Sequence, residues 1–148
     1  MNRQTLGLET LDVRYQRQAA NALYIAGRLS EISAISKVTY IGLKDNPFYN
    51  LARKQFGPTS GAMVIIDLES KEACFDFINR LKLVHRATNL FDNRTLAIHP
   101  ASTIFGNFTT EQLEQMDIRD TTIRLSIGLE DPDDILDDIR QALNTSGN

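Results

Sequence analysis

The sequence has little sulfur and imidazole chemistry: one cysteine, Cys74, and two histidines, His85 and His99, among 148 residues. A single cysteine excludes an internal disulfide and is typical of a protein from a reducing cytoplasm. The three residues are spread along the chain and form no metal-ligand pattern. A catalytic Cys/His pair stays open on the count alone, but Cys74 lies in the apolar pattern "EACFDFI", which favours a buried core position.

Basic charge and long apolar runs are also lacking. The 16 Lys and Arg residues are outnumbered by 19 Asp and Glu residues, for a net charge of −3, so nothing indicates nucleic acid or a membrane surface as a partner. No apolar run approaches the roughly 20 residues that span a bilayer. The first residues lack the apolar segment of a signal peptide, which adds to the expectation of a cytoplasmic protein. The chain also has no G-x-G-x-x-G, P-loop or G-x-S-x-G motif.

What is present is an ordinary composition, 42% hydrophobic and 24% charged, with enough residues for one domain over 1–148. Apolar periodicity and turn residues predict helices and strands in alternation. The helices are expected at 7–33, 47–56, 70–83, 109–118 and 130–143, and the strands at 37–43, 62–68, 95–101 and 121–129. Several connections are too short for parallel crossovers, so we expect an α+β (two-layer α/β) fold: a mixed or antiparallel sheet of about four strands covered by helices, with a long N-terminal helix.

Local signals refine three of these segments. Ser70 is a plausible N-cap for the helix over 70–83, whose apolar stripe includes Cys74 and Phe77. The acidic run "EDPDDILDD" lacks the glycine and terminal glutamate of a calcium loop and predicts a helix N-terminus instead. In "IHPAST", a strand ends at a proline turn, and a structural role is favoured for His99. The tail "NTSGN" is expected to fray.

One arginine stands out. In "TTIRLSIGLED", Ile123, Leu125 and Ile127 alternate with polar residues, and Arg124 lies on the opposite face. Either Arg124 is a solvated strand residue, which spacing alone favours, or it supplies a fixed positive charge to a site. A guanidinium matches a carboxylate with two charge-assisted hydrogen bonds, and a strand fixes its direction.

Four segments in this order carry a family resemblance: "GLETLDVRYQRQAANALYIAGRL", "SGAMVIIDL", "LAIHPAST" and "IRLSIGLEDPDDILDDIRQAL". Together they resemble the C-terminal third of the Cys/Met-metabolism family of pyridoxal-phosphate enzymes. This family includes cystathionine gamma-synthase and gamma-lyase, methionine gamma-lyase and O-acetylhomoserine sulfhydrylase. The resemblance runs from Leu6 to Leu143 and implies the C-terminal small domain of a fold-type I enzyme.

The resemblance also implies site residues. The arginine of "IRLSIG" binds the substrate α-carboxylate in the family, which maps onto Arg124. "NLFDNRTLAIHPAST" is most similar to the O-acetylhomoserine sulfhydrylase branch, where an asparagine commonly stands at the position of Asn89; it would help to hold the same carboxylate. By the same resemblance, Thr103 would line the active-site entrance. Ile104 and Phe105 depart from the threonine–histidine pair that many relatives have at these positions.

The family's Schiff-base lysine and phosphate-binding loop lie upstream of the matched region and have no counterpart here. We therefore expect the complete enzyme to bind pyridoxal phosphate and an amino-acid substrate and to add a sulfur nucleophile to O-acetylhomoserine, whereas this chain alone lacks the cofactor's anchor. Relatives are dimers or tetramers, so a homo-oligomer is expected. The alternatives are a fragment of a cystathionine enzyme or methionine gamma-lyase, an inert truncated domain acting as an oligomerisation or interaction module, or a ferredoxin-like ligand-binding domain.

Overall fold

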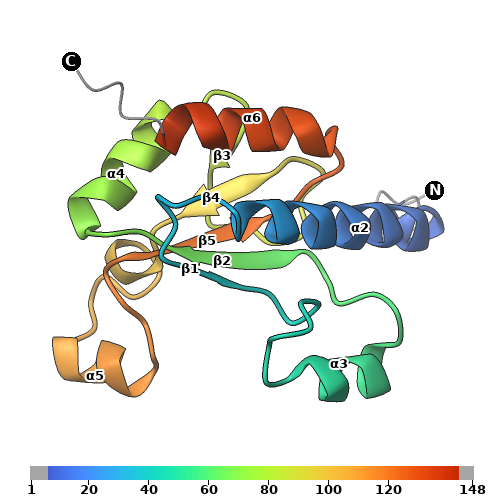
Figure 1. The fold of residues 1–148 in the computed structure, drawn as a ribbon, viewed down its shortest axis with the longest axis horizontal. Helices are drawn as coiled ribbons and strands as arrows, with labels where there is room; N and C mark the ends of the chain where they lie inside the picture. The colour runs from blue at the N-terminus through green and yellow to red at the C-terminus, as the bar shows by residue number, and fades with distance from the viewer. Residues whose placement is uncertain (1–6, 144–148) are drawn as a thin grey trace.

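The computed structural model describes residues 7–143, in which helices and a five-stranded sheet form two layers (Figure 1). The strands are β1 (Lys37–Thr39), β2 (Met63–Asp67), β3 (His85–Arg86), β4 (Leu96–Ile98) and β5 (Thr122–Ser126). The helices are α2 (Leu11–Leu29), α3 (Tyr49–Phe56), α4 (Lys71–Arg80), the short 3₁₀ helix η1 (Pro100–Ser102), α5 (Thr110–Gln115) and α6 (Pro132–Leu143).

The sheet is mixed, as expected, with the spatial order β1-β2-β5-β4-β3. All neighbouring strands are antiparallel except β3 and β4, which are parallel. The expectation of about four strands was one strand short, because β3 was missed. It consists of two exposed polar residues, so it carries no alternating apolar pattern and exists only through its pairing with β4.

The two faces of the sheet differ because side chains alternate along β2 and β5. Val64, Ile66, Ile123 and Leu125 are fully buried on the face covered by α2, α4 and α6 (Figure 1). Each such side chain contributes roughly 1.5–3 kcal/mol through its removal from water. The core therefore lies between the central strands and these three helices.

Helix α2 is shorter than the helix expected over 7–33. A separate helical segment at 7–9 ends at Thr10, and α2 runs from Leu11 to Leu29. At its C-terminal end the Ser30 hydroxyl donates to the carbonyl of Ala26, 2.9 Å away. A hydroxyl that binds the preceding turn slightly destabilises a helix, and this contact accompanies the end of α2.

Helix α4 follows the sequence closely. The Ser70 hydroxyl accepts a hydrogen bond from the backbone N–H of Ala73 at 3.1 Å, which confirms the predicted N-cap. Cys74 is fully buried, and burial raises the pKa of its thiol to about 11. The predicted core role of Cys74 is thereby confirmed.

The end of α4 is fixed by a buried carboxylate on α6. Asp138, 6% exposed, accepts hydrogen bonds from the backbone N–H groups of Lys82, Leu83 and Val84 at 2.9–3.2 Å. These donors have no helical partner because the chain has left α4. Asp138 therefore attaches the connection between α4 and β3 to the last helix.

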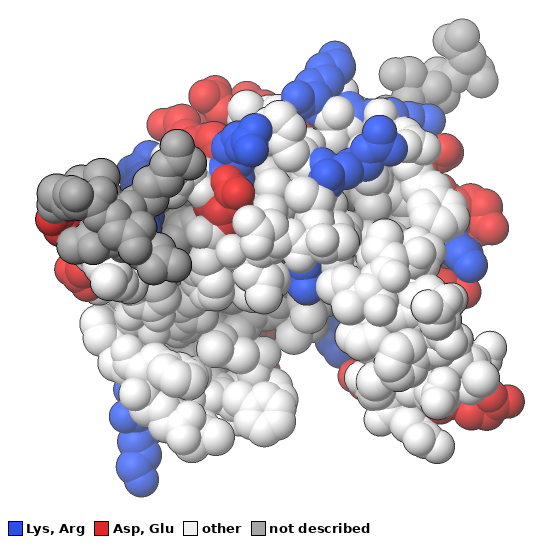
Figure 2. All heavy atoms as spheres, turned by 180° about the vertical axis from the view of Figure 1, so that it is seen from behind, with Lys and Arg blue, Asp and Glu red and all other residues white. Residues whose placement is uncertain are grey.

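Helices α3 and α5 lie beyond the other face of the sheet, on either side of its centre (Figure 1). Seen from behind, the molecule is hollowed between the two lobes that carry these helices, and most atoms around the hollow are uncharged (Figure 2). Helix α3 begins at Tyr49, two residues after the expected start at Pro47, and α5 begins after a Thr109 capping box. Within residues 7–143, no helix is both long enough and apolar enough to cross a membrane.

Candidate functional site

Arg124 lies in the middle of β5, on the open face of the sheet. Its partners across the neighbouring strands are Ile65 of β2 and Ile98 of β4. The guanidinium Nη2 donates a hydrogen bond to the carbonyl oxygen of Thr88 at 3.0 Å. The side chain is partly buried, and this burial lowers its pKa, although an arginine stays charged at neutral pH. The structure thus places a fixed cation on the face away from Ile123 and Leu125, as predicted.

Arg124 opens into a cavity of about 290 Å³ in which charges of both signs meet. The charged side chains that line it are Lys37, Asp67, Asp117, Arg119 and Arg124. Two of the three cations belong to the sheet and one to the segment before β5. The cavity has room for a small ligand such as an amino acid.

Asp67 is a site residue that the sequence reasoning missed. It is 7% exposed at the end of β2, and its carboxylate accepts a hydrogen bond from the Thr122 hydroxyl at 2.6 Å. It also forms an ion pair with Arg119 at 3.4 Å, and Arg119 pairs with Asp117 at 3.3 Å. The strand alternation could have predicted its position, because Asp67 lies two residues after Ile65 and so shares its face of the sheet.

Arg124 and Arg119 differ in whether a carboxylate lies beside them. Arg119 is held between two carboxylates, whereas among residues 7–143 no carboxylate lies within ion-pair distance of Arg124. A partly buried guanidinium whose one hydrogen bond to the described residues is to a backbone carbonyl keeps donors available for an anion. Of the two arginines in this cavity, Arg124 is therefore the better suited to receive a ligand carboxylate.

Asn89 lies close to Arg124 through its backbone, but its side chain faces elsewhere. The loop that contains it is attached to β5 at two points: Arg124 binds the carbonyl of Thr88, and the Ser126 hydroxyl accepts from the backbone N–H of Phe91 at 3.0 Å. Asn89 lies between these points, exposed, and its amide donates to Asp92 at 3.4 Å. The structure brings the loop of Asn89 to Arg124 without bringing the two side chains together.

Thr103 does not line the Arg124 cavity. It is exposed and lines a separate cavity of about 250 Å³ between α4, β4 and η1. Its hydroxyl donates to the carbonyl of His99 at 2.8 Å, which completes the turn after β4. Thr88, whose carbonyl accepts the hydrogen bond from Arg124, also lines this second cavity.

His99 is a structural residue, as predicted. It is 1% exposed, its Nε2 lies 2.7 Å from the carbonyl oxygen of Asp120, and its Nδ1 lies 2.8 Å from the hydroxyl of Ser102. The ring packs edge-on against Phe75, with centroids 5.1 Å apart. A carbonyl requires a donor, so Nε2 carries the proton and Nδ1 accepts from Ser102. Both nitrogens are therefore used to join η1 to the chain before β5.

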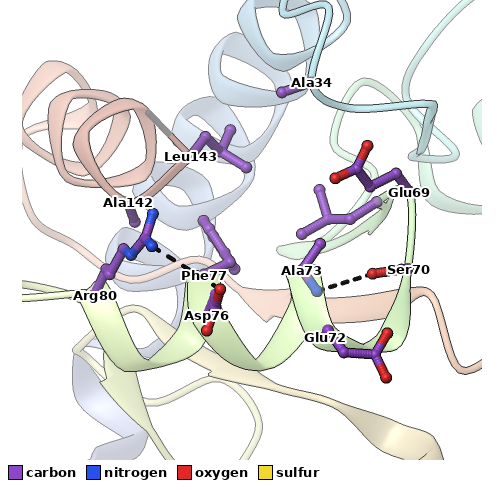
Figure 3. A pocket seen from close by; sticks show the side chains of 11 residues that line it. Ala34, Glu69, Ser70, Glu72, Ala73, Asp76, Phe77, Arg80, Ala142 and Leu143 are labelled. Atoms are coloured by element: carbon purple, nitrogen blue, oxygen red, sulfur yellow. Dashed lines mark hydrogen bonds and ion pairs between the residues drawn. The ribbon is translucent and has the colours of Figure 1, made fainter. Parts of the chain in front are cut away.

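A larger cavity of about 350 Å³ lies in the helical layer and has the wrong charge for a carboxylate (Figure 3). Glu69, Glu72 and Asp76 project around it, and Arg80 pairs with Asp76 at 3.9 Å (Figure 3). Acidic groups repel an anionic ligand. Within the described part of the chain, no three His, Cys, Asp or Glu residues are arranged to hold a metal ion.

The comparisons with known proteins agree in one family. A family model described as Cys/Met metabolism PLP-dependent enzyme matches residues 3–144. The chain is 39% identical over 139 residues to O-acetyl-L-homoserine sulfhydrylase 1 of Thermus thermophilus, and 39% identical over 139 residues to L-methionine gamma-lyase of Treponema denticola. Each match covers 93% of this chain.

Solved structures give the same result. A Campylobacter jejuni structure described as an O-acetylhomoserine (thiol)-lyase, which carries N′-pyridoxyl-lysine-5′-monophosphate, superposes with a TM-score of 0.90 at 35% identity. The O-acetylhomoserine sulfhydrylase of Wolinella succinogenes superposes with a TM-score of 0.83 at 38% identity. The chain covers 33% and 37% of these structures, and about a third of the length of the curated relatives it matches.

The residues of this chain do not make an anchoring site for pyridoxal phosphate. The cofactor is held through a Schiff base to a lysine in a shaped pocket. All five lysines of the sequence are exposed: Lys37, Lys44, Lys54, Lys71 and Lys82. Lys37 reaches the Arg124 cavity, but from the edge strand of the sheet. What the cavity offers is a partly buried guanidinium, that of Arg124, rather than a buried lysine.

Proposed function

Because the chain belongs to the Cys/Met metabolism family of PLP-dependent enzymes, we propose that it forms the substrate-binding C-terminal domain of an enzyme similar to O-acetylhomoserine sulfhydrylase. In this proposal, Arg124 binds the α-carboxylate of the amino-acid substrate. Asn89 adds a hydrogen bond once its side chain turns from Asp92, and Thr103 borders the approach. The relatives act on amino acids or their O-acyl derivatives, which supports this substrate class.

The observation that carries the proposal is the state of Arg124. Its guanidinium is partly buried on a strand, is oriented by the carbonyl of Thr88, and has no carboxylate partner among the described residues. A planar guanidinium can bind both oxygens of a carboxylate, and a rigid strand holds it in one direction. The contribution to catalysis is positioning: a substrate fixed at its carboxylate presents its reacting carbons in one orientation.

Methionine gamma-lyase is a second candidate for the parent activity. The Treponema denticola lyase and the Thermus thermophilus sulfhydrylase match this chain with the same identity. Both relatives are named for amino acids that carry an α-carboxylate, so the role proposed for Arg124 is the same in either case. The choice between them is made by which substrate the complete enzyme converts.

A chimaera tests the proposal. Residues 3–144 replace the matching third of the Thermus thermophilus sulfhydrylase, and KM is measured for O-acetyl-L-homoserine. We expect Arg124→Ala to raise KM about 10- to 100-fold, since a charge-assisted hydrogen bond contributes roughly 1.5–3 kcal/mol. Arg124→Lys, the matched control, keeps the charge but loses the two-pronged contact. Its KM is expected to lie between that of the unaltered chimaera and that of Arg124→Ala. An unchanged KM in Arg124→Ala would refute the role.

A further inference from the structure

Phe91 has a backbone conformation that its side chain disfavours. Its φ is 53°, in the left-handed region that glycine adopts freely and bulky residues rarely do. Asp117 is the other described non-glycine residue with positive φ, and aspartate tolerates this region. Strain of this kind persists where the surroundings impose it, and it is concentrated at functional sites.

The surroundings of Phe91 do impose it. Its backbone N–H donates to the Ser126 hydroxyl of β5 at 3.0 Å. The next carbonyl, of Asp92, accepts from the Gln18 amide of α2 at 2.7 Å, and the carbonyl of Asn93 accepts from the N–H of Leu129 at 2.8 Å. Three consecutive residues are thus attached to three different segments, and the direction of the Phe91 side chain is set by the fold.

The ring of Phe91 lines an apolar hollow of about 390 Å³ on the open face of the sheet. The larger side chains around it are Tyr15, Tyr40, Phe56, Met63, Ile65 and Phe91. Gly61 forms its floor near Phe91: a Cβ at that position would meet the edge of the ring at 4.0 Å. No Lys, Arg, Asp or Glu side chain lines the hollow.

The hollow adjoins the cavity of Arg124. Thr39 and Ile65 line both, and Ile65 lies directly opposite Arg124 in the sheet. A ligand whose carboxylate binds Arg124 therefore has an apolar surface beside it, reached across one residue. An ionised side chain there would lose hydration without gaining a partner, whereas an aliphatic one gains by leaving water.

We propose that Phe91 is a specificity-determining residue whose ring forms the wall of a subsite for the uncharged aliphatic side chain of the amino acid held by Arg124. The inference rests on the proposed role of Arg124. It names the substrate class more narrowly: α-amino acids with a long, neutral side chain are preferred over short ones and over ones with a terminal carboxylate.

The test is a titration of the 148-residue chain with matched amino acids, followed by ¹H–¹⁵N NMR. L-norleucine and L-alanine present the same carboxylate and differ by three methylene groups, each contributing about fourfold when fully buried. Since the hollow is open, we expect L-norleucine to bind roughly tenfold more tightly than L-alanine and L-glutamate. Phe91→Gly removes the ring and relieves the left-handed strain, and we expect it to abolish this preference while leaving L-alanine binding unchanged.

Phe108→Ala is the matched control, because Phe108 is a half-exposed ring outside the hollow. It should keep the tenfold preference.

Retention of the preference in Phe91→Gly overturns the role of Phe91 alone. If neither amino acid binds, or if Arg124→Ala binds both as well as the unaltered chain, the carboxylate anchor fails and the inference fails with it. Concentration-dependent self-association through the hollow, seen by sedimentation, would assign this surface to a second copy instead and also overturn the proposal.

Discussion

The two faces of the central sheet are formed by the same strands but have different side chains and different roles. On the face covered by α2, α4 and α6, adjacent strands contribute fully buried aliphatic residues such as Ile66 and Leu125. On the opposite face, the same strands contribute Ile65, Asp67 and Arg124 around two adjoining cavities. The comparison shows that one face supplies stability, which leaves the other free to carry charge and strain.

The largest expected effect separates adjacent residues of β2. Ile66→Ala should reduce the free energy of unfolding by about 2–5 kcal/mol, because it leaves a cavity in a closed core. Ile65→Ala, one residue earlier on the open face, should cost about 1 kcal/mol or less, because its side chain is already partly hydrated. Urea denaturation of both variants checks this. Equal losses would contradict the division between the faces.

The next effect concerns the polar support of the helical layer. Asp138→Ala removes the acceptor of three backbone N–H groups and should cost roughly 2–3 kcal/mol in thermal or urea unfolding. Asp137→Ala is the control, since Asp137 is an exposed partner of Arg140 and should contribute under about 0.5 kcal/mol. A small cost at Asp138 would mean that these donors find water instead.

A smaller effect depends on pH. Burial raises the pKa of Cys74 from 9.0 to about 11, so the folded state holds the thiol protonated more strongly than the unfolded state does. Its contribution is complete below pH 9 and is lost as pH rises from about 9 to 11. At pH 10 the loss should be about 1 kcal/mol relative to pH 8. Cys74→Ala should lack this component, and an identical pH dependence in both proteins would show that the thiol is accessible to water.

The smallest effect on stability is expected at Arg124. Because its one described hydrogen bond is exposed, Arg124→Ala should change the free energy of unfolding by under about 0.5 kcal/mol. The same substitution is expected to remove carboxylate binding. A large loss of stability would place Arg124 among the structural residues and weaken the contrast between the faces.

The features that could be predicted from the sequence are those that depend on residues close together in the chain. Periodicity located α4, β2, β5 and α6, because the order of apolar and polar residues within a short segment determines which face of a helix or strand is buried. The orientation of Arg124 followed from the alternation of β5. These features needed only a few neighbouring residues.

What could not be predicted depends on contacts between distant segments. The strand β3 exists only because β4 lies beside it, and the ion pair of Asp67 with Arg119 joins residues 52 positions apart. The left-handed conformation of Phe91 is imposed by Ser126, Gln18 and Leu129, none of them local. The proposed roles of Asn89 and Thr103 came from resemblance, and their geometry here leaves both as predictions.

The most direct test of the account follows the Arg124 Nε–H resonance of the 148-residue chain during titration. L-norleucine carries a carboxylate, and L-norleucinol has a hydroxymethyl group in its place. We predict that L-norleucine shifts this resonance and slows its exchange with water, while L-norleucinol leaves it unchanged, since a guanidinium binds a carboxylate far more strongly than an alcohol. An equal change with both ligands, or no change with either, would contradict the assignment of the open face as a carboxylate-binding site.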